Sequence, residues 1–113
     1  MKWHKNLWMG KDLDEKLWKI KWKINHNVGQ LNIYLLTIPT NPHNQLEIIH
    51  SAMLLFKHYP KKDLYIVGIA KGYEEALSLV CQITEQTLRE THTANIREYI
   101  LKTENKGGET CQS

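Results

Sequence analysis

Apolar residues and lysines alternate without a break in residues 18–24, Trp-Lys-Ile-Lys-Trp-Lys-Ile. A period of two places the apolar side chains on one side of a β-strand and the lysines on the other. The pattern therefore predicts a strand with one side in a core and the other facing water or an anionic partner. The apolar side would hold Trp18, Ile20, Trp22 and Ile24, and the basic side would hold Lys19, Lys21 and Lys23.

Further runs rich in β-forming residues follow this segment. Residues 31–38, Leu-Asn-Ile-Tyr-Leu-Leu-Thr-Ile, are apolar on both sides and end before Pro39, which is typical of a central strand. Residues 64–70 form a similar run, and residues 96–101 form a short mixed run suited to an edge strand. A turn at residues 26–29, which contains Asn and Gly, joins the first two strands as an antiparallel hairpin.

Two helices are predicted between these strands. The first covers residues 41–59, with Asn41 as the cap and Pro42 at the first helical position, and Pro60 ends it. The second covers residues 73–91, opens with two glutamates in its first turn and keeps the spacing of an amphipathic helix. The predicted order of elements is therefore β-β-α-β-α-β.

Topology rules convert this order into a fold. Strands joined through helices should run parallel with right-handed crossovers, and the hairpin occupies one flank of strand 31–38. The simplest sheet order is then 1-2-3-4, in which both helices lie on the same side. We therefore predict an α/β domain with a four-stranded mixed sheet, two helices on one face and no helix on the other face.

The length of 113 residues is enough for one two-layer core and too short for two domains. We expect a single domain over residues 1–101, which begins with a Trp- and Lys-rich segment at residues 1–16. Residues 102–113 contain two consecutive glycines and no apolar period, so we expect a flexible C-terminal tail.

Targeting signals are absent from the printed sequence. No stretch approaches the roughly 18 to 20 consecutive apolar residues of a membrane helix, and the basic N-terminus lacks the apolar region of a signal peptide. Two cysteines do not make a disulfide framework. These features predict a cytoplasmic protein without a membrane partner.

The face without helices is the basis of the preferred functional hypothesis. A contiguous apolar surface of this kind is unusual for a monomer, so something should cover it. A second copy of the chain ranks first, the N-terminal segment 1–16 second and a nucleic acid third. The chain would then be a non-enzymatic protein that acts through protein–protein contact as a homodimer, with the interface residues Tyr34, Leu36, Ile38, Tyr65, Val67 and Ile69.

The charge distribution supports an alternative hypothesis, nucleic-acid binding. Residues 1–24 hold seven lysines and three acidic residues, a net charge of +4, and the whole chain has +3, so the remainder has −1. Lysines beside exposed tyrosines could hold phosphates while bases stack on the rings. The simpler alternative is that the lysines protect an edge strand from aggregation. The nucleic-acid candidates are Lys19, Lys21, Lys23, Tyr34 and Tyr65.

Candidate catalytic chemistry is sparse, so no enzyme is predicted. Six histidines form no pair at metal-ligand spacing, and we expect neither a metal nor a cofactor. Cys81, and Ser51 beside His50, lack the arrangement of a nucleophile with its base. A third hypothesis is a small phosphorylated ligand at residues 70–72, between a strand and a helix. This segment lacks the spacing of the phosphate-binding fingerprints, and the two glutamates that follow would repel an anion.

Overall fold

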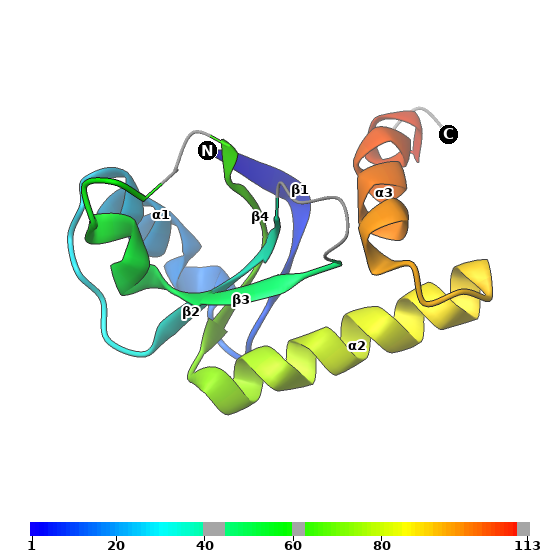
Figure 1. The fold of residues 1–113 in the computed structure, drawn as a ribbon, viewed down its shortest axis with the longest axis horizontal. Coiled ribbons are helices and arrows are strands. Elements are labelled where there is room, and N and C mark those ends of the chain that lie inside the picture. The colour runs from blue at the N-terminus through cyan, green and yellow to red at the C-terminus, as the bar shows by residue number, and fades with distance from the viewer. Residues whose placement is uncertain (40–44, 60–62, 111–113) are drawn as a thin grey trace.

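One mixed β-sheet organises the fold, with helices packed against both of its faces (Figure 1). The computed structural model describes residues 1–39, 45–59 and 63–110, with side chains up to Thr103. In chain order the elements are β1 (Lys2–Met9), the 3₁₀ helix η1 (Asp14–Lys16), α1 (Leu17–Asn25), β2 (Ile33–Ile38), β3 (Glu47–His50), the 3₁₀ helix η2 (Ser51–Leu55), β4 (Tyr65–Lys71), α2 (Tyr73–Thr91) and α3 (Ile96–Thr110).

The strand order in the sheet is β1-β4-β2-β3. β1 runs parallel to β4, whereas β2 pairs antiparallel with both β4 and β3. The prediction of a four-stranded mixed sheet is therefore confirmed, but the predicted order 1-2-3-4 is wrong. The reason is that two of the predicted strands are helices, and two segments predicted otherwise supply strands.

The alternating segment is the main correction, because it forms helix α1 and not a strand. Helical spacing places Ile20 and Ile24 on the same side, and each is only 5% exposed. Trp18 and Trp22 point away from this side and are 71% and 52% exposed. The period of two therefore reflects two buried isoleucines and two exposed tryptophans on a helix.

The packing of β2 explains why this segment does not become a strand. Both long edges of β2 are already paired, one with β4 and the other with β3. No edge of β2 remains for a hairpin with residues 17–24, and Ile20 and Ile24 are buried against the sheet face instead. Tertiary packing decides the outcome here, as is common for short segments with weak local preference.

The predicted helix at residues 41–59 is also wrong over its described part, while residues 40–44 lie outside the described residues. Residues 47–50 form β3, in which Ile48 pairs with Leu36 and Ile49 pairs with Leu35. β-branched residues favour such a strand. The His50 ring then accepts a hydrogen bond from the Ala52 amide, 3.0 Å away, and begins η2.

Residues 96–101, predicted as an edge strand, belong to helix α3. Ile96, Tyr99 and Ile100 are buried at the three- and four-residue spacing of one helix side. The Asn95 side chain caps the helix, since it accepts a hydrogen bond from the Glu98 amide at 3.2 Å and donates one to the Glu98 carboxylate at 3.0 Å. The helix continues to Thr110, and the flexibility predicted for residues 102–113 stays a prediction.

Three predicted elements are confirmed: a central strand at β2, a strand at β4 and a helix at α2. The alternation along β2 is confirmed as well, since Ile33 and Leu35 face one side and Leu36 and Ile38 the other. On β4 the alternation is interrupted. Leu36 pairs with Gly68 and Thr37 with Ile66, so β4 has one extra residue there, a β-bulge.

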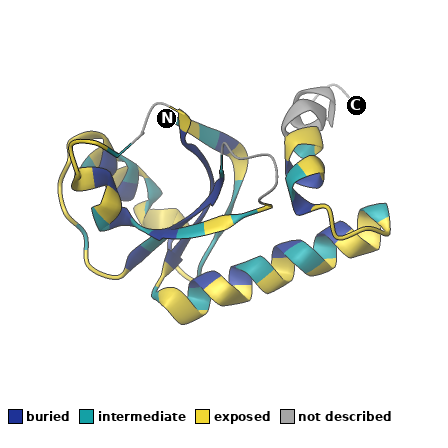
Figure 2. Ribbon diagram, in the orientation of Figure 1, coloured by how far each residue is buried: buried dark blue, intermediate teal, exposed yellow. Residues whose placement is uncertain are grey.

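The two sheet faces carry two separate clusters of buried residues, and both clusters are covered (Figure 2). α2 and α3 cover the face with Leu36, Ile38 and Val67. α1 and η2 cover the face with Leu35 and Ile69. The predicted arrangement, with two helices on one face and the other face bare, is therefore wrong.

Candidate functional site

The six predicted interface residues lie inside the chain's own fold. Five of them are at most 8% exposed, and Tyr34 is partly exposed. Four of the buried residues lie on the face that α2 and α3 cover, whereas Ile69, predicted on the same face, lies on the opposite face because of the β-bulge in β4. Neither sheet face therefore offers this surface to a second copy. Self-association stays a prediction, but it requires a different surface. The five buried residues are Leu36, Ile38, Tyr65, Val67 and Ile69.

The helical form of α1 separates the three lysines that were predicted to act together. Lys19 and Lys23 are four residues apart and lie on one flank of the helix. Lys21 lies on the other flank, with its ammonium group 5.0 Å from the centre of the Trp3 ring. The predicted set of three therefore divides into a pair and a single residue.

The two tyrosines of the nucleic-acid hypothesis are not near this pair. Tyr34 and Tyr65 belong to the sheet face that α2 and α3 cover, whereas α1 covers the opposite face. The Tyr34 ring makes edge contacts with the rings of His50 and Tyr73, at 4.8 and 5.7 Å. A sheet platform that combines these tyrosines with the lysines does not form.

Lys19 and Lys23 instead join two other lysines around one groove of about 510 Å³. Lys16 comes from η1 and Lys71 from the end of β4. Leu13, Ile20 and Ile33 are buried beneath the groove, and Leu31 at its rim is 90% exposed. We call this feature the lysine groove; its lining comprises Leu13, Lys16, Lys19, Ile20, Lys23, Gly29, Gln30, Leu31, Ile33 and Lys71.

Local backbone contacts bring the end of β4 to this groove. Lys71 is paired with Ile33 in the sheet, and the next amide, that of Gly72, donates to the Asn32 carbonyl at 2.7 Å. Gly72 has φ of +89°, which suits glycine because it lacks a Cβ. The change of chain direction at Gly72 ends the strand directly after Lys71. The side chain of Lys71 lines the groove at this end of the strand.

The described lining of the lysine groove contains no acidic residue. Within residues 1–39, 45–59 and 63–103, none of its four ammonium groups lies within ion-pair distance of a carboxylate. The Glu75 carboxylate lies beside the Lys71 backbone, whose amide donates a hydrogen bond to it at 2.8 Å, but Glu75 does not line the groove. Four positive charges around an apolar floor make this groove suited to an anion.

The hypothesis of a phosphate site at residues 70–72 is changed by these contacts. The Lys71 amide donates to Glu75 and the Gly72 amide donates to Asn32, so neither amide is directed at a ligand. The side chain of Lys71 remains, and it belongs to the same groove as Lys19 and Lys23. The phosphate-site hypothesis and the nucleic-acid hypothesis, which concern separate segments of the sequence, therefore involve the same groove.

Among the four lysines of the groove, Lys16 is the one that the sequence hypotheses do not include. Lys16, Lys19 and Lys23 follow the three- and four-residue spacing of one helix side. That signal was present, but the interpretation of residues 18–24 as a strand concealed it.

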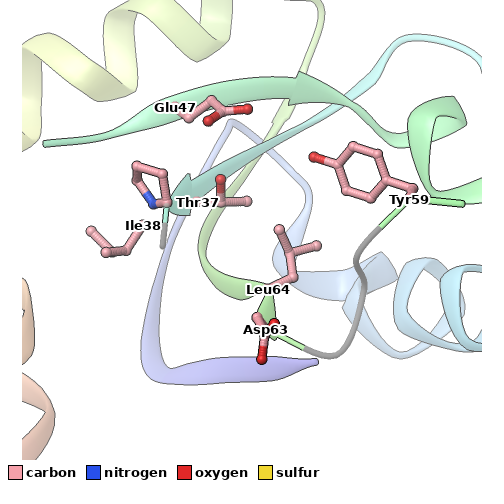
Figure 3. Close-up of a pocket in the computed structure, with 7 residues that line it drawn as sticks. Thr37, Ile38, Glu47, Tyr59, Asp63 and Leu64 are labelled. Atoms are coloured by element: carbon pink, nitrogen blue, oxygen red, sulfur yellow. The ribbon is translucent and has the colours of Figure 1, made fainter. Parts of the chain in front are cut away.

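A second cavity, of about 190 Å³, has the opposite charge (Figure 3). Glu47 and Asp63 contribute two carboxylates, and the hydroxyl of Tyr59 points toward Thr37. Burial raises the pKa of Tyr59 above its ordinary value, and the nearby Glu47 carboxylate raises it further. This cavity is therefore unsuited to a phosphate.

Metal-binding and nucleophilic groups form no further site in the described part of the chain. No group of three His, Cys, Asp or Glu residues in the described ranges is arranged to hold a metal ion. His4 is buried, and its ring accepts a hydrogen bond from the Asn6 amide at 3.0 Å. Cys81 is exposed on α2.

Comparison with known proteins finds no matching family, no matching curated protein and no matching solved structure. No helix in the described ranges is long and apolar enough to cross a membrane. The geometry of the lysine groove therefore carries the functional conclusion.

Proposed function

We propose that this chain is a non-enzymatic binding protein whose lysine groove holds phosphate groups of an anionic partner. The supporting observation is the convergence of four lysines from η1, α1 and β4 on one groove whose described lining has no carboxylate. Like charges gathered in this way repel one another, and a bound anion relieves that repulsion.

The groove has the size and lining of a binding site for a small anionic group. A volume of about 510 Å³ lies within the usual range for ligand sites, which are mostly apolar with a few placed polar groups. Each lysine ammonium is a mobile point charge with three hydrogen-bond donors, which suits phosphate oxygens approached from several directions. The apolar floor suits a phosphate that is attached to a less polar group.

This proposal keeps part of the nucleic-acid hypothesis and changes its residues. Lys19 and Lys23 are retained, Lys16 and Lys71 are added, and Lys21 is removed. Phosphate is the chemistry that a nucleic acid shares with every other partner of this class. The preferred hypothesis of protein–protein contact is less well suited to this surface, because lysine is depleted in the cores of protein interfaces.

A binding experiment with inorganic tripolyphosphate tests the proposal. Isothermal titration calorimetry at low salt should detect binding to the natural sequence. The double variant Lys19→Gln/Lys23→Gln should weaken it roughly tenfold or more, since each partly exposed charge pair contributes up to about 1 kcal/mol. Raised salt should weaken it further, because exposed charges are screened.

Lys21→Gln is the control matched to Lys19→Gln alone, because each removes one positive charge, from opposite flanks of the same helix. It should leave tripolyphosphate binding nearly unchanged, and all variants should keep the thermal unfolding midpoint of the natural sequence within a few degrees. If tripolyphosphate does not bind at low salt, or if Lys21→Gln weakens binding as much as Lys19→Gln, the lysine groove is not a phosphate site.

A further inference from the structure

Exposed apolar side chains lie directly beside the lysine groove. Trp18 and Trp22 are four residues apart on the side of α1 that faces away from the sheet, and they are 71% and 52% exposed. Leu31, at the rim of the groove, is 90% exposed. Such a concentration of exposed large apolar side chains marks an interaction surface.

The apolar and basic side chains form adjacent rows on α1. Lys19 and Trp22 are three residues apart and therefore neighbours on the helix surface, so the tryptophan row adjoins the lysine row. Both η2 and α1 lie at the same end of the molecule (Figure 1). η2 adds Leu55, which is 44% exposed and approaches Gly29 of the groove.

We propose that this surface, formed by the lysine groove with Trp18, Trp22 and Leu31, docks on an anionic lipid bilayer. The proposal rests on the phosphate binding proposed above and names the source of the phosphate as lipid head groups. It revises the expectation of no membrane partner, which considered only membrane-spanning and signal segments. Lysines attract the negative surface of such a bilayer, and tryptophan and leucine enter the boundary between head groups and acyl chains. Tryptophan in particular suits this boundary because it is both large and amphipathic.

Two observations favour a bilayer over a single-stranded nucleic acid. One face of the Trp22 ring is already stacked on the His26 ring, with centroids 4.1 Å apart and planes 16° apart. Leu31, the most exposed of the large apolar residues, has no ring on which a base could stack. Sequence-independent binding of single strands depends on such aromatic stacking, whereas a bilayer interface accepts leucine equally well.

Acidic residues of η1, just before α1, limit the expected affinity. Asp14 and Glu15 are exposed and precede the lysine row, so residues 14–24 hold four lysines and two acidic residues, a net charge of +2. Lys71 adds one positive charge from β4. Binding should therefore be reversible and depend on the content of anionic lipid. Replacement of Glu15 by Gln should strengthen it.

Vesicle co-sedimentation tests the proposal. The full chain should bind vesicles of phosphatidylcholine with phosphatidylserine much more tightly than vesicles of phosphatidylcholine alone. Lys19→Gln/Lys23→Gln should reduce binding to the anionic vesicles by about 25-fold, from about fivefold for each lysine near an anionic surface. Glu15→Gln should increase it by up to about fivefold for the same reason.

A second pair of variants separates the apolar contribution from the charge. Trp18→Ser/Trp22→Ser, at two exposed residues outside the groove lining, should lose about tenfold or more in vesicle binding and keep its affinity for tripolyphosphate. Leu77→Ser/Leu88→Ser is the matched control, because it replaces two exposed leucines of α2, each 45% exposed, and it should bind vesicles like the natural sequence.

The outcomes distinguish this inference from the proposed function. The bilayer proposal is overturned if tripolyphosphate binds and vesicles do not, or if poly(U) binds more tightly than anionic vesicles. Either result leaves the proposed phosphate site in place. Vesicle binding that is unaffected by Trp18→Ser/Trp22→Ser also overturns the bilayer proposal, because adsorption would then be purely electrostatic. Absence of binding to tripolyphosphate, vesicles and poly(U) overturns both.

Discussion

Helices α1 and α2 pack on opposite faces of the same sheet and use their apolar residues differently. The buried positions of α2 recur at the spacing of a single helix side and end at Thr87, whose hydroxyl bonds within the helix. In α1 two isoleucines are buried, while its two largest residues, Trp18 and Trp22, face solvent. The core accounts for the buried side of α2, whereas Tyr73, Leu77 and Leu88 of that helix are 45% to 51% exposed. In α1 the core accounts for Leu17, Ile20 and Ile24, three of its five apolar residues, and leaves the two tryptophans exposed.

This difference shows that a regular pattern of apolar residues does not by itself identify the contacts that produce it. α2 is amphipathic because one side meets the sheet and the other meets water. α1 has apolar residues on two sides, of which only one meets the sheet. We attribute the second side to an external surface, and the predictions below test whether α1 and α2 differ in this way.

The largest expected effects come from the buried sides of the two helices. Ile83→Ala in α2 and Ile20→Ala in α1 should each lower the free energy of unfolding by about 2 to 4 kcal/mol, because each leaves a cavity at a residue that is at most 5% exposed. Trp18→Ala, although it removes far more side chain, should change this free energy by no more than about 0.5 kcal/mol. Urea unfolding followed by circular dichroism measures all three.

The comparison fails if Trp18→Ala destabilises the protein as much as Ile20→Ala. That result would mean that Trp18 is buried in solution and that the lysine groove lacks the exposed row described here.

An intermediate effect tests whether the alternating segment is helical at all. At Lys19, which is exposed on α1, alanine should give a more stable protein than threonine by roughly 0.5 kcal/mol, because β-branched residues lose rotamer freedom in a helix. Ser78, exposed on α2, is the matched position and should show the same sign. A preference for threonine at Lys19 with a preference for alanine at Ser78 would indicate that the alternating segment is a strand and not a helix.

The smallest expected effect is a shift in the pKa of one tyrosine near each sheet face. Burial raises the pKa of Tyr99 on the α2 side, and burial with the Glu47 carboxylate raises that of Tyr59 on the α1 side. A raised pKa in the folded state means that the contribution to stability is complete below the ordinary tyrosine pKa of about 10 and is lost as the pH rises through the raised pKa. Both tyrosines should therefore ionise above pH 10 in an absorbance titration of the folded protein.

Glu47→Gln provides the control for this titration. It removes the weaker of the two causes at Tyr59, so the pKa of Tyr59 should fall and that of Tyr99 should stay unchanged. An equal shift at both tyrosines would indicate a general loosening of the fold.

The parts of the fold that could be predicted are those in which local pattern and packing agree. α2 is long, has two glutamates in its first turn and buries one side, so its sequence pattern is compatible only with a helix. β2 and β4 are apolar on both sides because helices cover both faces of the sheet. The short alternating run at residues 18–24 fits a strand and a helix equally well, and only the pairing of β2 on both edges decides between them.

The candidate site could be predicted only in part for the same reason. Lys19 and Lys23 were identified from the concentration of charge, and Lys71 from its place between a strand and a helix. Their meeting depends on the register of β2 with β4, which places Lys71 opposite Ile33, and no local pattern encodes that register.

The parallel pairing of β1 with β4 also governs how the chain folds during its synthesis. β1 is the first strand to be made, but its partner is complete only when Lys71 has been added, 62 residues after Met9. At about 5 to 20 residues per second this delay lasts roughly 3 to 12 seconds. The β2 edge that β4 will occupy exists from the completion of Ile38 and stays open for the next 33 residues, and the alternating segment precedes it directly in the chain. We therefore expect the hairpin that the sequence pattern predicts to compete for this edge during synthesis until β4 pairs with β2.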